Sequence, residues 1–179
     1  KALKDAGFAN IPVISFNVVG MEKMPGFKIT PDMLEKLLKV VVYGDLLQKM
    51  LTKNRVYEVN RGETQKLYDE WMQKCKELVV HSSLSEFKKS IYDMVNDFEK
   101  IELDTSMKKP KVGIVGEVLI KYHPFGNNFI AEKLEQEGAE VILPDFMGFV
   151  KFMATHKITF NTLIKTDKYK AKIFKLAIK

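Results

Sequence analysis

The chain has 179 residues, 46% of them apolar and 29% charged, which suits one domain with a buried core. Its single cysteine excludes an internal disulfide and any metal or iron–sulfur site built from the thiolates of this chain alone. No apolar run approaches the roughly 18 residues that a membrane-spanning helix needs. We therefore expect a cytoplasmic protein with no membrane partner and no metal site of its own.

The net charge of +6 comes from one segment of the chain. Residues 157–179 contain seven lysines and a single acid, whereas basic and acidic residues balance over residues 1–156. A nucleic-acid-binding domain needs a basic face on its folded body, so we expect no nucleic-acid partner.

The chain begins with a short helical pattern that Gly7 would end. An apolar run follows at residues 11–16, IPVISF, and predicts a buried strand with Pro12 tolerated at its start. Residues 17–27 then form a loop. Because the helical patterns at both termini break off, we expect the chain to be part of a longer protein.

Thr30, Pro31 and Asp32 predict the start of a helix that runs to about residue 53. Residues 40–43 are apolar all round, so we expect this helix to be buried on more than one side. Gly44 and Asp45 interrupt its pattern. We favour a packing glycine beside a solvated aspartate; the alternative is a close backbone approach or a polar group facing a cleft.

Two more helices are predicted before the next strand. The first opens at residues 62–63 and ends near His81. Its apolar stripe consists of Leu67, Trp71, Cys75 and Leu78. On this stripe Cys75 is expected to be a buried, inert thiol. Ser83 and Glu86 have the spacing of a capping box for the second helix. Three consecutive helices indicate an insertion or a lid packed on a sheet.

Residues 109–145 have the pattern of a complete βαβ unit. A strand at 111–116 precedes a polar loop at 117–128, and a helix ended by Gly138 leads to a second strand at 140–143. Ligands of such units lie at the carboxyl ends of the strands, so the loop 117–128 is the expected functional segment.

A further helix is predicted from residue 146 to about 155, with Asp145 as its cap and His156 near its end. It has little polar face, which fits either a fully buried helix or a surface that packs on another part of a longer protein. Residues 158–164 are ambiguous between a loop and a short strand. Residues 167–179 predict an amphipathic helix with lysines on its solvated face.

These elements predict an α/β fold, in which a small parallel Rossmann- or flavodoxin-like sheet is built on the βαβ unit and carries a three-helix insertion or lid. Residues 1–30 supply a strand and loop of the α/β core, and residues 31–108 form the helical segment. Residues 109–156 supply the βαβ unit and the buried helix, and residues 157–179 form the basic tail.

The candidate catalytic residues of the loop are Glu117 and His123. A carboxylate directly after a strand can line a cleft, and an imidazole can move a proton near neutral pH. The candidate ligand-binding residues are Gly116, Lys121, Asn127 and Asn128. Among these, Lys121 could meet an anion, and the backbone N–H groups at the start of the next helix would favour phosphate.

Each candidate also has a structural interpretation. Glu117 can accept a hydrogen bond from a neighbouring helix start, His123 can bond within its own loop, Lys121 can be solvated, and an asparagine can cap the following helix. Neither GxGxxG nor GxxxxGK[ST] is present in the chain, so no standard nucleotide motif supports the loop.

The segment GIVGEVLIKYHPFGNNFIAEKLEQEGAEVILPD resembles a passage in the large activator-type proteins of the 2-hydroxyacyl-CoA (2-hydroxyglutaryl-CoA) dehydratase family. PVISFNVVGMEKMPGFKIT and VVYGDLLQKM look like the preceding region of the same proteins, so the resemblance spans most of residues 1–156. In that family, ATP hydrolysis drives a low-potential electron through cysteine-bound [4Fe–4S] clusters into a dehydratase, a lyase that removes water from a 2-hydroxyacyl-CoA.

The resemblance implies a domain from the dehydratase-like portion of such a protein, itself non-catalytic and serving to position a ligand or partner. The chain departs from a complete member because it lacks an ATP-binding glycine-rich motif and a set of cysteines. The [4Fe–4S] cluster and ATP are thus expected only in the parent protein. The implied partners are other domains of the parent chain, acyl-CoA or dehydratase subunits. The alternative is an independent small-ligand-binding α/β domain or enzyme that uses the loop 117–128.

Overall fold

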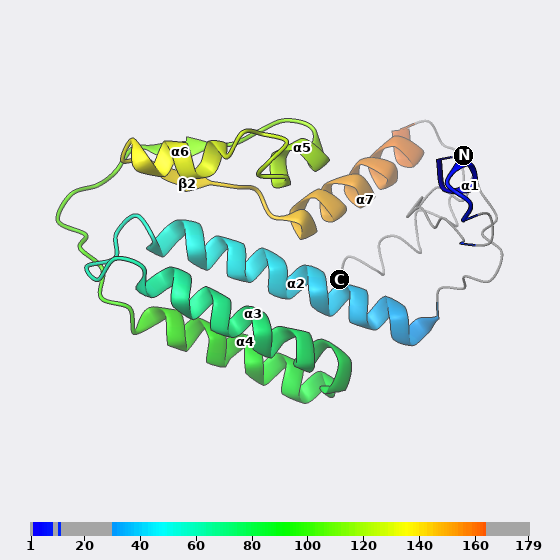
Figure 1. The fold of residues 1–179 in the computed structure, drawn as a ribbon, viewed down its shortest axis with the longest axis horizontal. Coiled ribbons are helices and arrows are strands. Elements are labelled where there is room, and N and C mark those ends of the chain that lie inside the picture. The colour runs from blue at the N-terminus through cyan, green and yellow to red at the C-terminus, as the bar shows by residue number, and fades with distance from the viewer. Residues whose placement is uncertain (1, 9–10, 12–29, 164–179) are drawn as a thin grey trace. The chain divides into compact units, whose positions relative to one another are not determined.

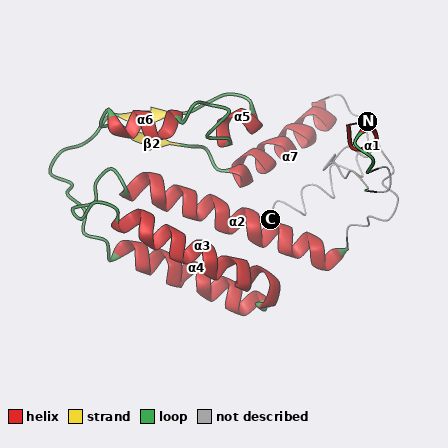
Figure 2. Ribbon diagram, in the orientation of Figure 1, coloured by secondary structure: helices red, strands yellow, loops and turns green. Residues whose placement is uncertain are grey.

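A computed structural model describes residues 2–8, 11 and 30–163 of the chain. The chain divides into two compact units, Lys1–Glu35 and Lys36–Lys179. In the first unit, helix α1 (Ala2–Asp5) is followed by Gly7 at a φ of +86°, which confirms the predicted glycine stop. Residues 12–16 of the predicted first strand and the predicted tail helix at 167–179 lie outside the described residues. The described chain is mixed α/β and mostly helical (Figures 1 and 2).

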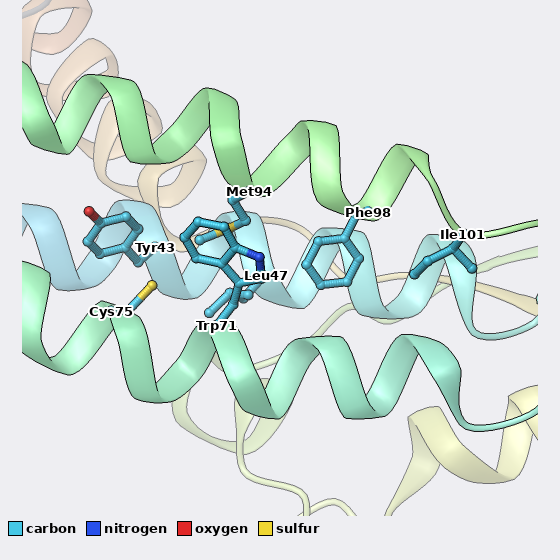
Figure 3. Close-up of a cluster of buried hydrophobic side chains, with 7 residues drawn as sticks. All are labelled: Tyr43, Leu47, Trp71, Cys75, Met94, Phe98 and Ile101. Atoms are coloured by element: carbon cyan, nitrogen blue, oxygen red, sulfur yellow. The ribbon is translucent and has the colours of Figure 1, made fainter.

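The largest hydrophobic core lies among three helices, α2 (Pro31–Asn54), α3 (Glu63–His81) and α4 (Leu84–Glu99). Each helix contributes an apolar stripe at helical spacing, and the stripes meet as Figure 3 shows. The buried members of this cluster are Tyr43, Leu47, Trp71, Cys75, Met94, Phe98 and Ile101. The predicted stripe of α3 and the buried state of Cys75 are therefore confirmed.

Several buried polar groups of this bundle are hydrogen-bonded across helices. The Tyr43 hydroxyl lies 2.6 Å from Ser90 Oγ, and Asn54 Nδ2 donates to the Phe98 carbonyl at 3.2 Å. Lys39 Nζ donates to the Ser82 carbonyl at 2.7 Å, which satisfies a carbonyl of the turn between α3 and α4. These bonds fix how the helices are aligned, because an unpaired buried polar group would be costly.

The helix starts follow the sequence closely. Thr30 Oγ1 accepts a hydrogen bond from the Met33 N–H at 3.1 Å. Ser83 and Glu86 form a reciprocal capping box at the start of α4, as predicted. His81 is the last residue of α3 and is exposed, which also confirms its prediction.

Helix α2 confirms one prediction and corrects another. It runs from Pro31 to Asn54, as predicted, and continues through Gly44 and Asp45, because a single glycine costs a helix only about 1 kcal/mol, which tertiary packing offsets. The prediction that α2 is buried on more than one side is wrong. Leu34, Leu37, Leu38 and Val40 are each about half exposed, since α3 and α4 cover only one stripe of the helix.

Two short strands, β1 (Lys111–Gly113) and β2 (Glu140–Ile142), form a parallel pair in which Val112 lies opposite Val141. Helices α5 (Val118–Tyr122) and α6 (Ile130–Gln136) connect them, and Gly138 ends the connection at a φ of +87°. The strands are thus parallel, as predicted, but β1 is shorter than the predicted 111–116. The predicted loop 117–128 contains the helix α5, which the sequence pattern did not reveal.

Helix α7 (Phe146–Leu163) is longer than predicted. His156 lies within it and not at its end, and the residues from 158 to 163 are helical, so the prediction of a loop or strand there is wrong. Of the two interpretations of its apolar pattern, full burial is wrong, because Phe152 is 63% exposed and Phe160 is 51% exposed. The interpretation as a surface that packs on another part of a longer protein stays a prediction. A helix satisfies its own backbone N–H and C=O groups whether or not other elements cover it. An apolar sequence pattern alone therefore does not show that the helix is buried.

The three-helix bundle is joined to the sheet at the C-terminal end of α2. Arg55 Nη2 lies 2.6 Å from Glu135 Oε2 of α6, and the Tyr57 hydroxyl donates to Glu140 Oε2 of β2 at 3.0 Å. The three helices were predicted to pack on the sheet as an insertion or lid. Their main core instead lies between the helices themselves, while polar bonds make this junction.

Within residues 2–8 and 30–163, no helix combines the length and the apolar character that crossing a bilayer requires.

We predict that Met94→Ala lowers the free energy of unfolding by about 2–5 kcal/mol, because Met94 is fully buried and its truncation leaves a cavity between the helices. Tyr92→Ala on the same helix is the matched control. Tyr92 is 71% exposed, so its removal should change stability by less than about 0.5 kcal/mol. Urea unfolding followed by circular dichroism measures both values, and equal losses would contradict this description of the core.

A second prediction concerns acid stability. Glu58 accepts hydrogen bonds from the Gly62 N–H at 2.6 Å and the Thr64 N–H at 2.8 Å. Burial by itself would raise the pKa of this carboxyl, but the N–H groups together outweigh it and hold the pKa below its usual value. A lowered folded-state pKa adds stability above the pKa of the unfolded chain, and this stability is lost as the pH falls through the folded-state pKa.

We therefore expect Glu58→Gln to be less stable than the parent sequence at pH 7. Its free energy of unfolding should also fall less between about pH 5 and about pH 3, because one titrating group has been removed. Urea unfolding at several pH values tests this. Parallel curves for the two proteins across that pH range would show that Glu58 does not contribute as described.

Candidate functional site

The predicted site residues lie together in the segment that connects β1 to α6, and most of their polar groups bond within it. Glu117 is the N-cap of α5, and its Oε2 accepts from the Ile120 N–H at 3.1 Å. His123 is exposed and its Nδ1 accepts from the Gly126 N–H at 2.8 Å. The structural interpretation of each residue is therefore the one observed, and their catalytic roles stay predictions.

Of the four candidate ligand-binding residues, Asn127 is also hydrogen-bonded within this segment. Asn127 Nδ2 donates to the carbonyls of Ile120 and Lys121, both at 3.1 Å, while its Oδ1 accepts from the Ile130 N–H at 3.3 Å at the start of α6. Asn128 is exposed at a φ of +64°, and Gly116 is exposed at a φ of +148°. Lys121 Nζ lies 4.6 Å from the centroid of the Tyr122 ring.

A cleft of about 760 Å³ lies between α2 and β2, and we call it the α2–β2 cleft. Only Tyr122 lines it from the segment that was predicted to hold the site. Its other walls come from one face of α2, from Tyr68 of α3, from the strands and from the segment after β2. The lining residues of α2 are Val41, Gly44, Asp45, Gln48, Lys49, Thr52 and Lys53. Those of the sheet and the segment after it are Lys111, Glu140, Val141, Ile142, Leu143, Pro144, Asp145 and Phe146.

Asp45 closes one end of this cleft by capping a helix that begins 101 residues later. Its Oδ1 accepts from the Phe146 N–H at 2.7 Å, and its Oδ2 accepts from the Met147 N–H at 2.8 Å. The first N–H groups of a helix lack partners within the helix and carry partial positive charge, so a carboxylate is favoured there. The favoured interpretation of Asp45 as a solvated aspartate is therefore wrong, and the alternative of a polar group facing a cleft is the one observed.

Tyr122 lies at the same end of the cleft. Its hydroxyl donates to the Pro144 carbonyl, and its ring packs edge-on against Phe146 with centroids 6.3 Å apart. Burial and the nearby carboxylates of Asp45 and Asp145 raise the pKa of the Tyr122 phenol, so this hydroxyl stays a neutral donor at physiological pH.

The opposite end of the cleft is basic. Lys49 and Lys53 lie one turn apart on α2, and Lys111 lies on β1. Glu140 is the acid at this end, and Lys111 Nζ lies 3.3 Å from its Oε1. These lysines are not among the residues predicted from the sequence to form a site. Their spacing of four residues was a signal, but lysines on exposed helix faces are common, and only the fold brings Lys111 to them.

A second pocket, of about 680 Å³, lies at the junction of the bundle and the sheet. Arg55 and Glu135 form an ion pair in it, and burial raises the pKa of Glu135 although the nearby Arg55 partly opposes this. Its lining carries charged groups of both signs and its ion pair joins the bundle to α6, so we assign this pocket to the junction and not to ligand binding.

The chain does not fit a [4Fe–4S] cluster. Cluster iron is held by several cysteine thiolates, and the only cysteine here lies in the bundle core. Burial raises the pKa of the Cys75 thiol to about 11, which keeps it protonated. Among the side chains that the structure describes, no three His, Cys, Asp or Glu residues converge on a position that would hold a metal ion.

Comparisons of this chain with protein-family models, with curated proteins and with solved structures gave no match.

We predict that Asp45→Ala lowers the free energy of unfolding by about 2 kcal/mol, because two N–H groups at the start of α7 lose a charged acceptor. Amide hydrogen exchange at Phe146 and Met147 should accelerate more than exchange in the bundle. Asp93→Ala is the control, since Asp93 is an exposed acid on α4 away from this contact. Unchanged exchange at both amides would contradict the capping role of Asp45.

Proposed function

We propose that this chain is a non-catalytic α/β domain of an activator-type protein of the 2-hydroxyacyl-CoA dehydratase system, and that it positions a ligand or partner in the α2–β2 cleft. The cleft carries this proposal. Lys49 and Lys53 line it without an ion pair to any described residue, whereas the polar groups of the predicted loop are largely engaged in bonds within their own segment.

The resemblance of residues 113–145 to such proteins supports the assignment to this system. ATP and the iron–sulfur cluster would then be held by other parts of a cytoplasmic parent protein, and this domain would act beside them. The parallel pair of β1 and β2 supports the finer proposal of a Rossmann- or flavodoxin-like sheet. Among the described residues the sheet has two short strands, which are marginal alone, so we infer that further strand pairing outside these residues completes it.

Small-ligand binding through the loop 117–128 is the second candidate. One observation favours it, which is that Tyr122 of this segment lines the α2–β2 cleft. Glu117 and His123 are both exposed and engaged with backbone N–H groups, so they have less freedom to act on a ligand than the lysines of the cleft have.

The proposal predicts that the 179-residue chain, assayed alone, neither hydrolyses ATP nor dehydrates a 2-hydroxyacyl-CoA, and that it contains no iron or sulfide. In the parent protein, Lys49→Gln combined with Lys53→Gln should lower dehydration about tenfold and leave the iron and sulfide content unchanged. Turnover by the chain alone would contradict the proposal.

Two loop variants of the parent protein separate the candidates. Glu117→Gln keeps a side-chain oxygen that can cap α5 but removes the charge, and His123→Ala removes the imidazole. If the cleft is the functional site, both variants should retain most of the activity that the double lysine variant loses. The reverse pattern, with activity lost only in the loop variants, would favour small-ligand binding through the loop.

A further inference from the structure

The two ends of the α2–β2 cleft differ in chemistry. At one end, Lys49 and Lys53 of α2 face the strand that carries Lys111. The acid at this end is Glu140, whose Oε2 accepts from the Tyr57 hydroxyl and whose Oε1 lies 3.3 Å from Lys111 Nζ. The described lining of this end thus has three ammonium groups and one carboxylate, which pairs with Lys111 alone, so its net charge is positive.

The positive charge is concentrated by the helix. Lys49 and Lys53 are four residues apart, so their side chains lie on the same face of α2 and repel each other. No hydrogen bond or ion pair joins either ammonium group to a described residue. An anion placed between them and Lys111 would relieve this repulsion.

The other end offers an apolar surface. Its carboxylates are already engaged, because Asp45 caps α7 and Asp145 accepts from the Gly148 N–H. Its apolar lining includes Val41, Leu143 and Phe146 beside Tyr122, and Ile142 of β2, which is 46% exposed, leads towards them. These side chains would be favoured contacts for an apolar group.

The distance between the two ends follows from the helix that forms one wall. Val41 and Lys53 are twelve residues apart on α2, which corresponds to roughly 18 Å at the rise of an α-helix. A compact anion would reach only the basic end, whereas an extended molecule would contact both.

We propose that the α2–β2 cleft binds an elongated amphiphile. Its anionic end, a carboxylate or phosphate, would lie against Lys49, Lys53 and Lys111, and its apolar body would lie along Ile142, Leu143 and Phe146 towards Val41. This inference deepens the proposed function, because it gives the chemical class of the ligand that the same cleft would position.

Isothermal titration calorimetry of the 179-residue chain tests the proposal with three probes, which are octyl phosphate below its critical micelle concentration, inorganic phosphate and octanol. Octyl phosphate should bind one molecule per chain, at least tenfold more tightly than inorganic phosphate and than octanol. Its affinity should fall as salt is added, because the exposed ammonium groups become screened. Equal affinity for octyl phosphate and inorganic phosphate would show a site for a free anion only and would overturn the amphiphile.

Variants locate the site. Lys49→Gln combined with Lys53→Gln should weaken the binding of octyl phosphate at least tenfold. The control, Lys66→Gln combined with Lys88→Gln, removes two exposed lysines outside the cleft and should change this affinity less than twofold. Ile142→Ser should weaken the binding of octyl phosphate and leave the affinity for inorganic phosphate unchanged. Because the Ile142 side chain is 46% exposed, we expect this variant to fold. Equal effects of the two lysine pairs would show that the binding site does not lie in the α2–β2 cleft.

The outcome is distinguishable from that of the proposed function. If octyl phosphate does not bind but the lysine variants of the parent protein still lose dehydration activity, the cleft does not bind an amphiphile and the proposed positioning role is kept. If octyl phosphate binds as expected and the same variants leave the parent protein's activity unchanged, the cleft binds an amphiphile and its proposed role in dehydration is wrong.

Discussion

The contact between Asp45 and the start of α7 determines how the described parts of the larger unit are joined. A single carboxylate in the middle of α2 accepts hydrogen bonds from two N–H groups of a helix that begins 101 residues later. The helix start needs acceptors and favours negative charge, and α2 supplies both. Arg55 and Tyr57 make a second junction with α6 and β2 at the C-terminal end of α2. The helix is therefore tied at two points along its length, and the cleft lies along the face between them.

The two junctions are polar, whereas the bundle is held by apolar packing. Tyr43, Trp71 and Met94 form a continuous core between α2, α3 and α4 that does not need the sheet. Such a core supplies most of the stability of a domain, because the free energy of burial scales with the apolar area removed from water. The sheet and α7 add little buried apolar surface of their own, and Val141 and Ala139 are their fully buried apolar residues among those described. The cleft thus lies where a rigid bundle meets a thin sheet through a few directed bonds.

This arrangement explains why polar residues of similar type have different roles. Glu117, His123 and Asn127 hold the shape of their own segment, since each accepts or donates within seven residues of itself. Lys49 and Lys53 have no ion pair with any residue that the structure describes, so their charges are the ones available to a ligand there. Charged groups without such a pair, and not the most reactive residue types, therefore define the best candidate site.

The amino-acid sequence by itself determined the helix starts, the apolar stripes, the buried thiol and the parallel pair of strands. These depend on short-range spacing, such as Ser83 with Glu86 or Trp71 with Cys75. It did not reveal α5 or the exposure of Phe152, because these depend on which neighbours cover a segment. Only the tertiary structure decided that Asp45 caps α7 and that Lys111 joins Lys49 and Lys53, since residues so far apart in sequence meet only when the strands and α2 pack together.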